Sequence, residues 1–266
     1  MEKIGLFASG GKFSKIAFNE MKSMGFLPVV FSFDTPVFSH YNDQIVLRFG
    51  DIEGFVRYAC NLGIKQVVFA GKINALDIFK KAVAESGARF LAGVKRFDSE
   101  NILNNLVDFL EKNHIKTIPL TKVFKKYLAQ EKIYTSIKLE KQHWSNILYG
   151  WHVAKQMAKM KIGQSVAAKN QMIIAVEAVE GTDRMILRSG KLCDGFTVVK
   201  VMRNGQDVRF DLPTVGPSTI RNISKAGGNI LAVEANKTVM IDIEKMISLA
   251  NTHSITIVGF CGKEIM

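Results

Sequence analysis

Residues 3–33, KIGLFASGGKFSKIAFNEMKSMGFLPVVFSF, decide the fold of this chain. The stretch contains two short apolar runs, Ile4–Ala8 and Leu27–Phe33, which have the length of buried strands. Between them come the turn Ser9-Gly10-Gly11 and a helically spaced segment, Ser14–Met24. Because such a crossover connection is right-handed, the two strands are predicted to be parallel neighbours in one sheet. The stretch therefore predicts a β-α-β unit.

The same alternation of strand and helix continues to about residue 118. Further strands are expected at Ile45–Phe49, Gln66–Ala70 and Ile115–Ile118, and helices at residues 51–62, 77–85 and 99–112. Asp51 is placed to cap the first of these helices, and Gly63 to end it. Alternating strands and helices imply an open parallel sheet covered on both faces, so the N-terminal domain is predicted to be Rossmann-like.

The alternation breaks over residues 119–135, a stretch that begins with Pro119. Its basic residues are Lys122, Lys125, Lys126 and Lys132. We place the domain junction here and expect an N-terminal domain over 1–133 and a C-terminal domain over 134–266, joined by a linker. A long helix is expected next, over residues 136–161, with Gly150 as its weak point because glycine disfavours helix.

The second half is expected to form another α/β domain, of mixed strand order. Strands are predicted at residues 165–168, 172–178, 196–201, 230–233, 238–241 and 255–260. Helices are predicted at residues 182–189, 217–226 and 242–251. The complete chain is therefore expected to be an α/β protein with two α/β domains.

The bulk composition agrees with two globular domains and points to an anionic partner. At 266 residues the chain exceeds the size at which one core usually stops growing. The net charge of +12 divides into +6 (19 basic minus 13 acidic residues) before residue 134 and +6 (17 minus 11) after it. A basic surface suits a nucleic acid, an anionic membrane or a phosphate-rich substrate. No nucleic-acid-binding motif is present.

The start of the chain and the length of its apolar runs bear on where the protein is expected to act. The start reads as a strand and a turn, and no apolar run approaches the roughly 20 residues that span a bilayer. The three cysteines are far apart and odd in number, which argues against a disulfide framework or structural zinc. We expect a cytoplasmic protein that touches a membrane from one side, and we place this contact at Lys122, Lys125 and Lys126.

Three segments carry candidate chemistry, and the first is the glycine turn after the first strand. Gly10 and Gly11 open a helix, where backbone amides can approach a phosphate. Gly71-Lys72 follows another strand and makes the same case for the same sheet edge, because ligands of open α/β sheets gather there. The alternative is a tight turn without a ligand.

The second segment is Glu177–Asp183, with three carboxylates in seven residues. Glu180 and Asp183 can help to hold a hard divalent ion through oxygen ligands, and Gly181 and Thr182 lie between them. The alternative is that Thr182 or Asp183 caps the following helix and Glu180 is solvated.

The third segment is the densest in charge, from Lys200 to Thr219. Asp207 and Asp211 can share a site with Arg209 and Lys200, and Gln206 and Thr214 flank them. Cleavage of a phosphoanhydride needs a metal or cations on the phosphates and a carboxylate that orients or deprotonates water. The alternative is a loop with surface ion pairs.

At these residues the chain resembles the I-type UDP-2,3-diacylglucosamine pyrophosphatases of lipid A synthesis. The matching strings are IGQSVAAKNQMIIAVEAVEGTDRMILRSG, GQDVRFDLPTVGPSTI and AGGNILAVEANKTVMID, all between Ile162 and Phe260. The sequence departs from the family pattern at Ser14, at Asn74-Ala75-Leu76 and at Arg203-Asn204.

The resemblance implies hydrolysis of UDP-2,3-diacylglucosamine to UMP and 2,3-diacylglucosamine 1-phosphate, with Mg²⁺ or another divalent cation such as Mn²⁺. It implies catalytic roles for Asp207, Arg209 and Asp211, substrate contacts from Gly10, Gly11, Lys72, Gly181, Thr182, Lys200, Gln206 and Thr214, and metal ligation by Asp207, Asp183 and Glu180. The substrate is a lipid-linked nucleotide sugar, so peripheral contact with the inner membrane is expected.

Other classes remain open at this point. A non-catalytic protein that binds a nucleotide sugar or phospholipid would keep the glycine turns and basic surface but would not need Asp207. A dehydrogenase is disfavoured because the GxGxxG fingerprint is absent, since Phe13 and Ser14 follow the glycine turn. Assembly as a homodimer is also left open.

Overall fold

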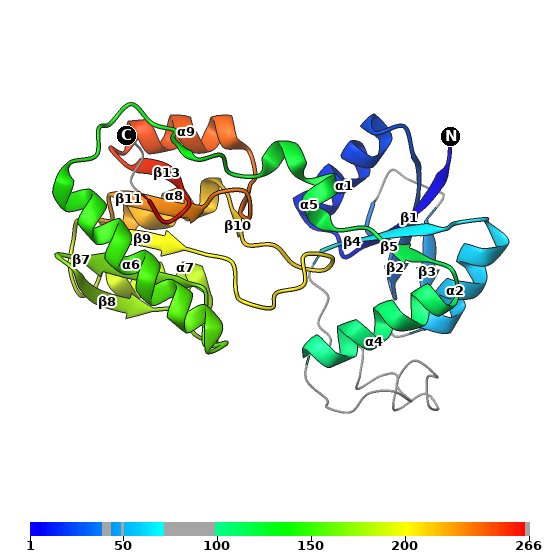
Figure 1. The fold of residues 1–266 in the computed structure, drawn as a ribbon. Coiled ribbons are helices and arrows are strands. Elements are labelled where there is room, and N and C mark those ends of the chain that lie inside the picture. Colours follow the sequence, from blue (N-terminus) through cyan, green and yellow to red (C-terminus); the bar gives the residue numbers. More distant parts are fainter. Residues whose placement is uncertain (39–43, 49–50, 72–98, 264–266) are drawn as a thin grey trace. The chain divides into compact units, whose positions relative to one another are not determined.

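The computed structural model describes the whole chain except residues 39–43, 49–50, 72–98 and 264–266 (Figure 1). Contacts divide it into two units. The first comprises Met1–Phe124 and Asp207–Asp211, and the second comprises Lys125–Gln206 and Leu212–Met266. The junction expected near residue 133 thus lies within the second unit by this division. The short segment 207–211, which the sequence reasoning assigned to the second half, packs with the first unit.

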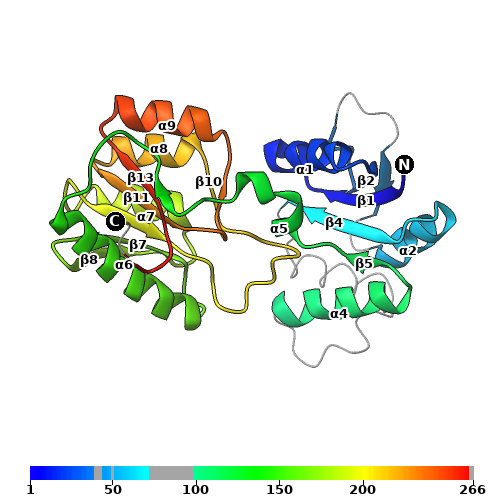
Figure 2. The same ribbon diagram turned by 45° about the horizontal axis from the view of Figure 1, so that its top comes forward.

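The first unit contains a parallel five-stranded sheet of strand order β3-β2-β1-β4-β5. Its strands are β1 (Lys3–Ala8), β2 (Leu27–Phe33), β3 (Ile45–Leu47), β4 (Gln66–Ala70) and β5 (Lys116–Thr117). Its helices are α1 (Gly11–Ser23), α2 (Ile52–Asn61), α4 (Ser99–Lys112) and α5 (Leu120–Val123). The helices lie on both faces of the sheet (Figures 1 and 2). The predicted Rossmann-like parallel sheet is confirmed.

The residues that were predicted to begin and end α2 do so in the structure. The Asp51 carboxylate accepts a hydrogen bond of 2.7 Å from the backbone N–H of Gly54, as an N-cap residue does. Gly63 follows the helix with a φ of 69°, a conformation that glycine adopts without a Cβ penalty. The helix expected over residues 77–85 lies outside the described residues.

An aromatic cluster forms one face of the first core. The ring of Phe7 lies 4.9 Å from Phe55 and 5.3 Å from Phe69, measured between centroids. Phe210 joins this cluster: it is only 4% exposed, and its ring lies 4.9 Å from that of Phe69. The carbonyl oxygen of Val208 also accepts a 2.8 Å hydrogen bond from the backbone N–H of Leu120. These contacts explain why segment 207–211 belongs to the first unit.

The second unit contains a six-stranded mixed sheet of order β6-β13-β11-β9-β7-β8. Its strands are β6 (Lys132–Ile133), β7 (Ser165–Lys169), β8 (Met172–Val176), β9 (Thr197–Lys200), β11 (Ile230–Glu234) and β13 (Thr256–Phe260). β9, β11 and β13 are parallel, whereas β6, β7 and β8 pair antiparallel with their neighbours. A separate two-stranded sheet joins β10 (Thr214–Val215) and β12 (Val239–Met240). The prediction of a mixed α/β domain is confirmed.

Helices cover both faces of the larger sheet (Figure 1). α6 (Lys141–Lys159) packs on one face, and α7 (Thr182–Ser189), α8 (Pro217–Lys225) and α9 (Ile243–Thr252) pack on the other. Alternate residues of β11 serve the two sides: Ile230 and Ala232 pack with α6, and Leu231 and Val233 pack with the other helices. The central strand is therefore buried on both faces, which is why it reads as a continuous apolar run.

The stretch between the last helix of the first unit and α6 contains a short 3-10 helix, η2 (Lys125–Tyr127), and the edge strand β6. Neither was predicted, because two or three residues carry no periodicity. Among the described residues, no helix combines the length and apolar character needed to cross a bilayer.

α6 runs unbroken through Gly150, and the structure gives this glycine a packing role. A Cβ at position 150 would lie 2.7 Å from Cγ2 of Val199 on β9, closer than side chains normally approach. It would also lie 3.5 Å from Cβ of Ala168 on β7. Gly150 thus allows α6 to approach the sheet closely, and the interpretation of this residue only as a weak point of the helix is incomplete.

We predict that Gly150→Val lowers the free energy of unfolding by about 1–3 kcal/mol, because it overpacks the contact with Val199. Both tryptophans, Trp144 and Trp151, lie on α6, so denaturant titration followed by tryptophan fluorescence reports this unit. Tyr149→Val, at the neighbouring half-exposed position, is the control and should change stability by less than about 0.5 kcal/mol. A Gly150→Val protein as stable as wild type would show that close packing does not require the glycine.

Candidate functional site

The first candidate region lies at the carboxyl edge of the first sheet. The chain leaves β1 on one side for β2 and β3 and returns on the other side as β4, so the order reverses between β1 and β4. Ligands of open α/β sheets bind at such a reversal. The Ser9-Gly10-Gly11 turn and Gly71 follow these two strands and so meet here.

Ser14 ties the two strand ends together. Its buried hydroxyl lies 2.6 Å from the carbonyl oxygen of Ala70 and 2.9 Å from that of Gly10, and it can donate to either. A Cβ on Gly71 would overlap the Ser9 side chain, so the approach of the two turns requires glycine there. The departure from the family pattern at Ser14 thus supplies a hydrogen bond that fixes the turn.

Gly10 and Gly11 have positive φ values, 86° and 74°, a backbone conformation that glycine adopts without a Cβ penalty. Among the described residues, no atom lies within 4 Å of a Cβ placed on Gly11, so these residues leave space beside the first residue of α1. Backbone amides at a helix start can approach an anion in such a space. Lys72, predicted to act with them, lies outside the described residues.

Asp207 and Arg209 form the most closely bonded pair of predicted residues. Oδ1 of Asp207 accepts from the backbone N–H and from Nε of Arg209, both at 2.9 Å. Oδ2 accepts from Nε at 2.9 Å and from Nη2 at 2.6 Å. The guanidinium therefore clamps both carboxylate oxygens, a geometry that fixes the orientation of the carboxylate.

The surroundings favour the charged form of the Arg209 guanidinium. Its hydrogen bond to Asp207 raises the pKa of the Arg209 guanidinium above its ordinary value, and the nearby carboxylates of Glu111 and Asp108 add to the effect. Both partners are partly accessible, with 19% of the Asp207 side chain and 28% of the Arg209 side chain exposed. The backbone N–H of Asp211 donates to the carbonyl oxygen of Asp207, while the Asp211 residue itself is exposed. Asp207 is thus held yet open to solvent on one side.

The second candidate region lies at the carboxyl edge of the second sheet. Lys200 ends β9, and Ser165, at the start of antiparallel β7, lies directly opposite it. Glu177 follows β8, whose last residues pair with the start of β7, and Glu234 ends β11 beside β9. The topology therefore brings four polar residues from separate strands to one edge.

Thr182, the first residue of α7, is the centre of this cluster. Its hydroxyl accepts a 2.8 Å hydrogen bond from Nζ of Lys200 and donates a 2.9 Å bond to Oε1 of Glu177. Oγ of Ser165 lies 3.3 Å from the same hydroxyl. Lys200 and Glu177 are both only 7% exposed, so the threonine links a buried cation to a buried carboxylate. Such charge-assisted bonds in a buried setting are strong.

Glu177 was not selected from the sequence as a site residue, although it begins the string that was. The usable signal is a glutamate directly after an apolar strand and five residues before a threonine that starts a helix. The pairing itself depends on the strand order, which sequence spacing does not show.

Glu180, Asp183 and Gly181 occupy the same loop and helix start but do not join the Thr182 cluster through any described bond. Oε1 of Glu180 pairs with Nη2 of Arg188 at 2.6 Å, and this bond lowers the pKa of the Glu180 carboxyl. Its other oxygen accepts from the backbone N–H of Ala178. Asp183 is exposed in the first turn of α7, and Gly181 precedes the helix with a φ of 82°.

Gln206 and Thr214 make local bonds at the two ends of the segment that contains Asp207. Oε1 of Gln206 accepts from the backbone N–H of Arg203 at 3.1 Å, and the Thr214 hydroxyl donates to the carbonyl oxygen of Leu212 at 3.0 Å. The structure thus gives both residues a role in loop geometry.

One residue that was not predicted from the sequence bonds to the backbone of Met202, ahead of the segment that contains Asp207. Glu234, 5% exposed at the end of β11, accepts a 2.8 Å hydrogen bond from the backbone N–H of Met202. Lys155 of α6 lies 2.7 Å from both of its carboxylate oxygens. No local motif marks Glu234, because its partners are 32 and 79 positions away.

The predicted metal ligands are divided between the units: Asp207 belongs to the first, and Glu180 and Asp183 belong to the second. Within the part of the chain that the structure describes, no three acidic, histidine or cysteine side chains gather as a ready-made metal site. The carboxylates are nevertheless suitable donors for a hard cation. Mg²⁺ is commonly held by one or two carboxylates plus substrate phosphates, and the predicted ligands of each unit, taken by themselves, are carboxylates of this kind.

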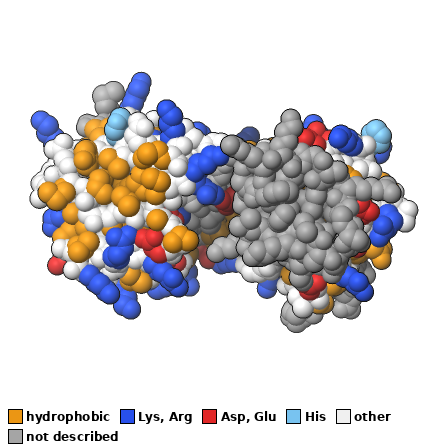
Figure 3. Space-filling view, turned by 90° about the horizontal axis from the view of Figure 1, so that it is seen from below, with side chains coloured by type: hydrophobic (Ala, Val, Ile, Leu, Met, Phe, Trp, Pro, Cys, Tyr) orange, Lys and Arg blue, Asp and Glu red, His pale blue; other side chains and the backbone are white. Residues whose placement is uncertain are grey.

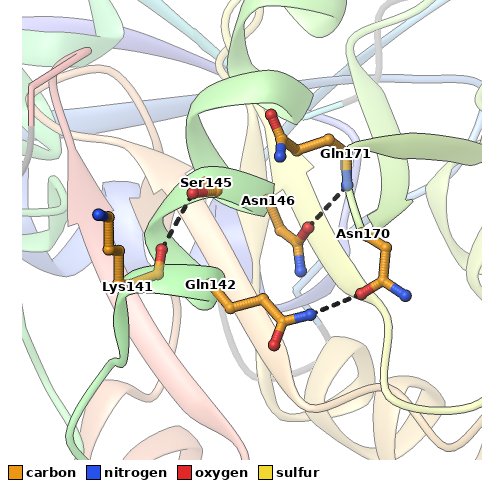
Figure 4. A pocket seen from close by; sticks show the side chains of 6 residues that line it. All are labelled: Lys141, Gln142, Ser145, Asn146, Asn170 and Gln171. Carbon is orange, nitrogen blue, oxygen red and sulfur yellow. Dashed lines mark hydrogen bonds between the residues drawn. The ribbon is translucent and has the colours of Figure 1, made fainter.

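A polar pocket of about 460 Å³ lies elsewhere, at the amino end of α6 (Figure 4). Its lining residues are Lys141, Gln142, Ser145, Asn146, Asn170 and Gln171. Gln142 donates to the Asn170 side chain at 2.8 Å, and Asn146 accepts from the backbone N–H of Gln171 at 3.0 Å. The Asn170-Gln171 turn follows β7, so the pocket is at the edge of the sheet opposite Lys200 and contains none of the predicted site residues.

Both units present polar residues beyond the carboxyl ends of parallel strands, which defines an α/β protein of the class that binds ligands at these edges. Comparison with known proteins narrows this class. Models described as the LpxI N-terminal domain and the LpxI C-terminal domain match residues 3–127 and 130–258. The chain belongs to the LpxI family.

A curated relative matches the chain from end to end. The UDP-2,3-diacylglucosamine pyrophosphatase LpxI of Caulobacter vibrioides is 25% identical over 276 residues, which cover 97% of this chain and 98% of the relative. Similar solved structures include N5-carboxyaminoimidazole ribonucleotide synthetase from Thermotoga maritima, which is 21% identical and has a TM-score of 0.25. The match covers 66% of this chain and 42% of that protein. An N-terminal ketoreductase from a macrolactin assembly line has 8% identity, coverage of 98% and 54%, and a TM-score of 0.26. These scores are too low to support any argument.

We predict that Thr182→Val destabilises the second unit by about 1–3 kcal/mol, because it leaves Lys200 and Glu177 buried without the hydroxyl that joins them. Thermal and denaturant unfolding followed by tryptophan fluorescence provide the measurement. Thr182→Ser keeps the hydroxyl and should remain close to wild type. Equal stability of the valine and serine variants would show that the hydroxyl does not join the two charges.

Proposed function

We propose that this protein hydrolyses the pyrophosphate bond of UDP-2,3-diacylglucosamine to UMP and 2,3-diacylglucosamine 1-phosphate in lipid A synthesis. The observation that carries the proposal is the match of both LpxI domain models, which together span nearly the whole chain, with the Asp207–Arg209 clamp present within it. A curated relative of this name aligns over almost its full length. The family assignment favours this reading over a non-catalytic binding protein.

Asp207 is the proposed catalytic carboxylate. Its orientation is fixed by Arg209 while part of the side chain stays accessible, as a group that must meet water or a cation requires. An ionised aspartate can accept a proton from the attacking water or ligate a cation, and the proposal includes both roles. Arg209 holds the carboxylate in place. Asp211, exposed and four residues further on, is the competing candidate.

The phosphate-bearing substrate is proposed to bind at the two sheet edges. In the first unit, Gly10 and Gly11 are proposed to offer backbone amides at the start of α1, and Lys72 is proposed to add its charge. In the second unit, Lys200 brings a positive charge to the start of α7, near Gly181 and Thr182. Gln206 and Thr214 are proposed to contact substrate from the ends of the Asp207 segment.

A divalent cation, Mg²⁺ or Mn²⁺, is proposed as the cofactor. When bound, it would offset negative charge on the pyrophosphate oxygens. Asp207 is the proposed principal protein ligand, with Asp183 and Glu180 as the further ligands. Glu180 is paired with Arg188, so its participation would require exchange of that partner.

The protein is proposed to act at the cytoplasmic face of the inner membrane, in peripheral contact with it. The substrate has two acyl chains, and a protein that takes such a lipid from a bilayer must reach the interface. The net charge of +12 favours an anionic lipid surface.

We predict that the purified protein releases UMP from detergent-dispersed UDP-2,3-diacylglucosamine in the presence of Mg²⁺, as measured by chromatography of the nucleotide products. Chelation of the cation should abolish release, and added Mg²⁺ or Mn²⁺ should restore it. Absence of UMP with either cation would contradict the proposed reaction, whereas release that persists in chelator would contradict only the metal dependence.

We predict that Asp207→Ala lowers turnover by at least about a hundredfold, the scale of losing a general base, with little change in substrate binding. Turnover and substrate affinity are measured separately on protein whose fold is checked by circular dichroism. Asp211→Asn is the matched control and should retain most activity. If Asp207→Asn keeps near-full turnover while Asp211→Asn is inactive, the two aspartates exchange roles.

A further inference from the structure

Apolar side chains are exposed together on one face of the second unit, over α6 and β8 (Figure 3). We call this the α6–β8 face and define it by exposed apolar residues of α6, of the end of β8 and of the loops that follow these elements: Tyr149, Met160, Ile162, Val176 and Val179. Val179 is fully exposed, and Met160 is 62% exposed. Contiguous apolar surface of this kind usually marks an interaction site.

The two loops of this face are in contact. The backbone of Gly163, next to Ile162, lies so close to Glu177 that a Cβ at position 163 would overlap the Glu177 carbonyl oxygen. The backbone N–H of Gln164 also points to the Glu177 carboxylate, at 3.4 Å. Ile162 after α6 and Val179 after β8 therefore flank the same residue. That residue is Glu177 of the Thr182 cluster, so the apolar loops border the second candidate region.

Cations accompany the apolar side chains. In the sequence Lys159-Met160-Lys161-Ile162, all four residues are exposed, so charged and apolar side chains alternate at the surface. Residues 141–181 contain five lysines and two glutamates, but Lys155 is paired with Glu234 and Lys169 donates to the carbonyl oxygen of Asp194, so Lys159 and Lys161 are the cations beside the apolar side chains. Of the two glutamates, Glu177 is buried and Glu180 is paired with Arg188. The face is therefore apolar and positively charged.

The combination of apolar and positively charged side chains distinguishes between the possible binding partners of the α6–β8 face. A second copy of the chain would bring a second set of the same lysines against these, and like charges repel. An anionic lipid surface attracts the lysines and accepts the apolar side chains at the boundary between headgroups and acyl chains. Lys122, Lys125 and Lys126, where the sequence suggested membrane contact, are exposed but are not accompanied by large exposed apolar residues of the same segment.

We propose that the α6–β8 face docks onto an anionic lipid surface and places the Thr182–Lys200 cluster beside the lipid headgroups. The proposal rests on the proposed function, because it identifies the surface through which a lipid-linked substrate is reached. The docking contact is apolar and electrostatic, with Met160, Ile162 and Val179 at the interface and Lys159 and Lys161 beside them.

The experiment is flotation of the full-length protein with vesicles of phosphatidylcholine containing about 30% phosphatidylglycerol, compared with pure phosphatidylcholine. Wild type should float with the anionic vesicles and much less with the neutral ones. Met160→Asp combined with Ile162→Asp should reduce the bound fraction by about tenfold, because aspartate removes apolar contact and adds repulsion. Lys159→Glu combined with Lys161→Glu should weaken binding similarly.

Leu192→Asp is the matched control, since Leu192 is also 62% exposed but lies after α7, outside the α6–β8 face. It should float like wild type. Flotation of the Met160→Asp/Ile162→Asp protein at wild-type level, or no flotation of wild type, would overturn the proposal. The proposal would also be overturned if gel filtration with light scattering showed that wild type is a dimer and that this double variant is a monomer that still floats like wild type.

Hydrolysis separates this proposal from the proposed function. The double variant should cleave detergent-dispersed UDP-2,3-diacylglucosamine like wild type and lose about tenfold in rate on the same substrate embedded in anionic vesicles. Equal loss on both substrates would place the two residues in the active site and overturn the docking role. Absence of hydrolysis by wild type on either substrate would refute the proposed function, while the flotation result would still decide the docking surface.

Discussion

Burial of Phe210 in the first core is the interaction on which the arrangement of the candidate site depends. The ring packs on Phe69 near the end of β4, and its 4% exposure means that leaving the core would expose a large apolar surface. Asp207 and Arg209 lie within three residues of this anchor, and the bond from Leu120 to Val208 holds the backbone between them. A hydrophobic contact thus positions a polar pair that could not hold a unique place by itself.

The carboxyl edge of a parallel sheet is the second constraint, and both units use it. In the first unit the reversal of strand order between β1 and β4 leaves two glycine turns side by side, with the Ser14 hydroxyl between them. In the second unit the end of β9 and the antiparallel start of β7 bring Lys200 and Ser165 together at Thr182. In each case strands from distant parts of the chain supply one group of polar atoms, which are the means by which such edges recognise phosphates.

Charged side chains in both candidate regions are each bonded to a specific partner. Arg209 clamps Asp207, Thr182 links Lys200 to Glu177, and Glu234 joins Lys155 to the backbone of Met202. A buried charge without a partner costs several kcal/mol, so each ionised residue near the ligand edges needs a counterpart. These partners fix the orientation of the groups that are proposed to meet the substrate, and preorganised groups of this kind stabilise a reacting phosphate without rearranging first.

The sequence by itself determined the elements and the class. Apolar runs of strand length alternating with helical periodicity indicated two α/β domains, because local burial patterns are written residue by residue. The strings around Glu180 and Asp207 indicated the family and supplied the candidate site residues. Tertiary structure decided the partners: that Asp207 is clamped by Arg209 and anchored to the first unit through Phe210, that Glu177 bonds to Thr182 and Glu234 to the backbone of Met202, and that Gly150 is a packing glycine. These facts depend on strand order and on contacts between residues far apart in the chain, and local periodicity carries no information about either.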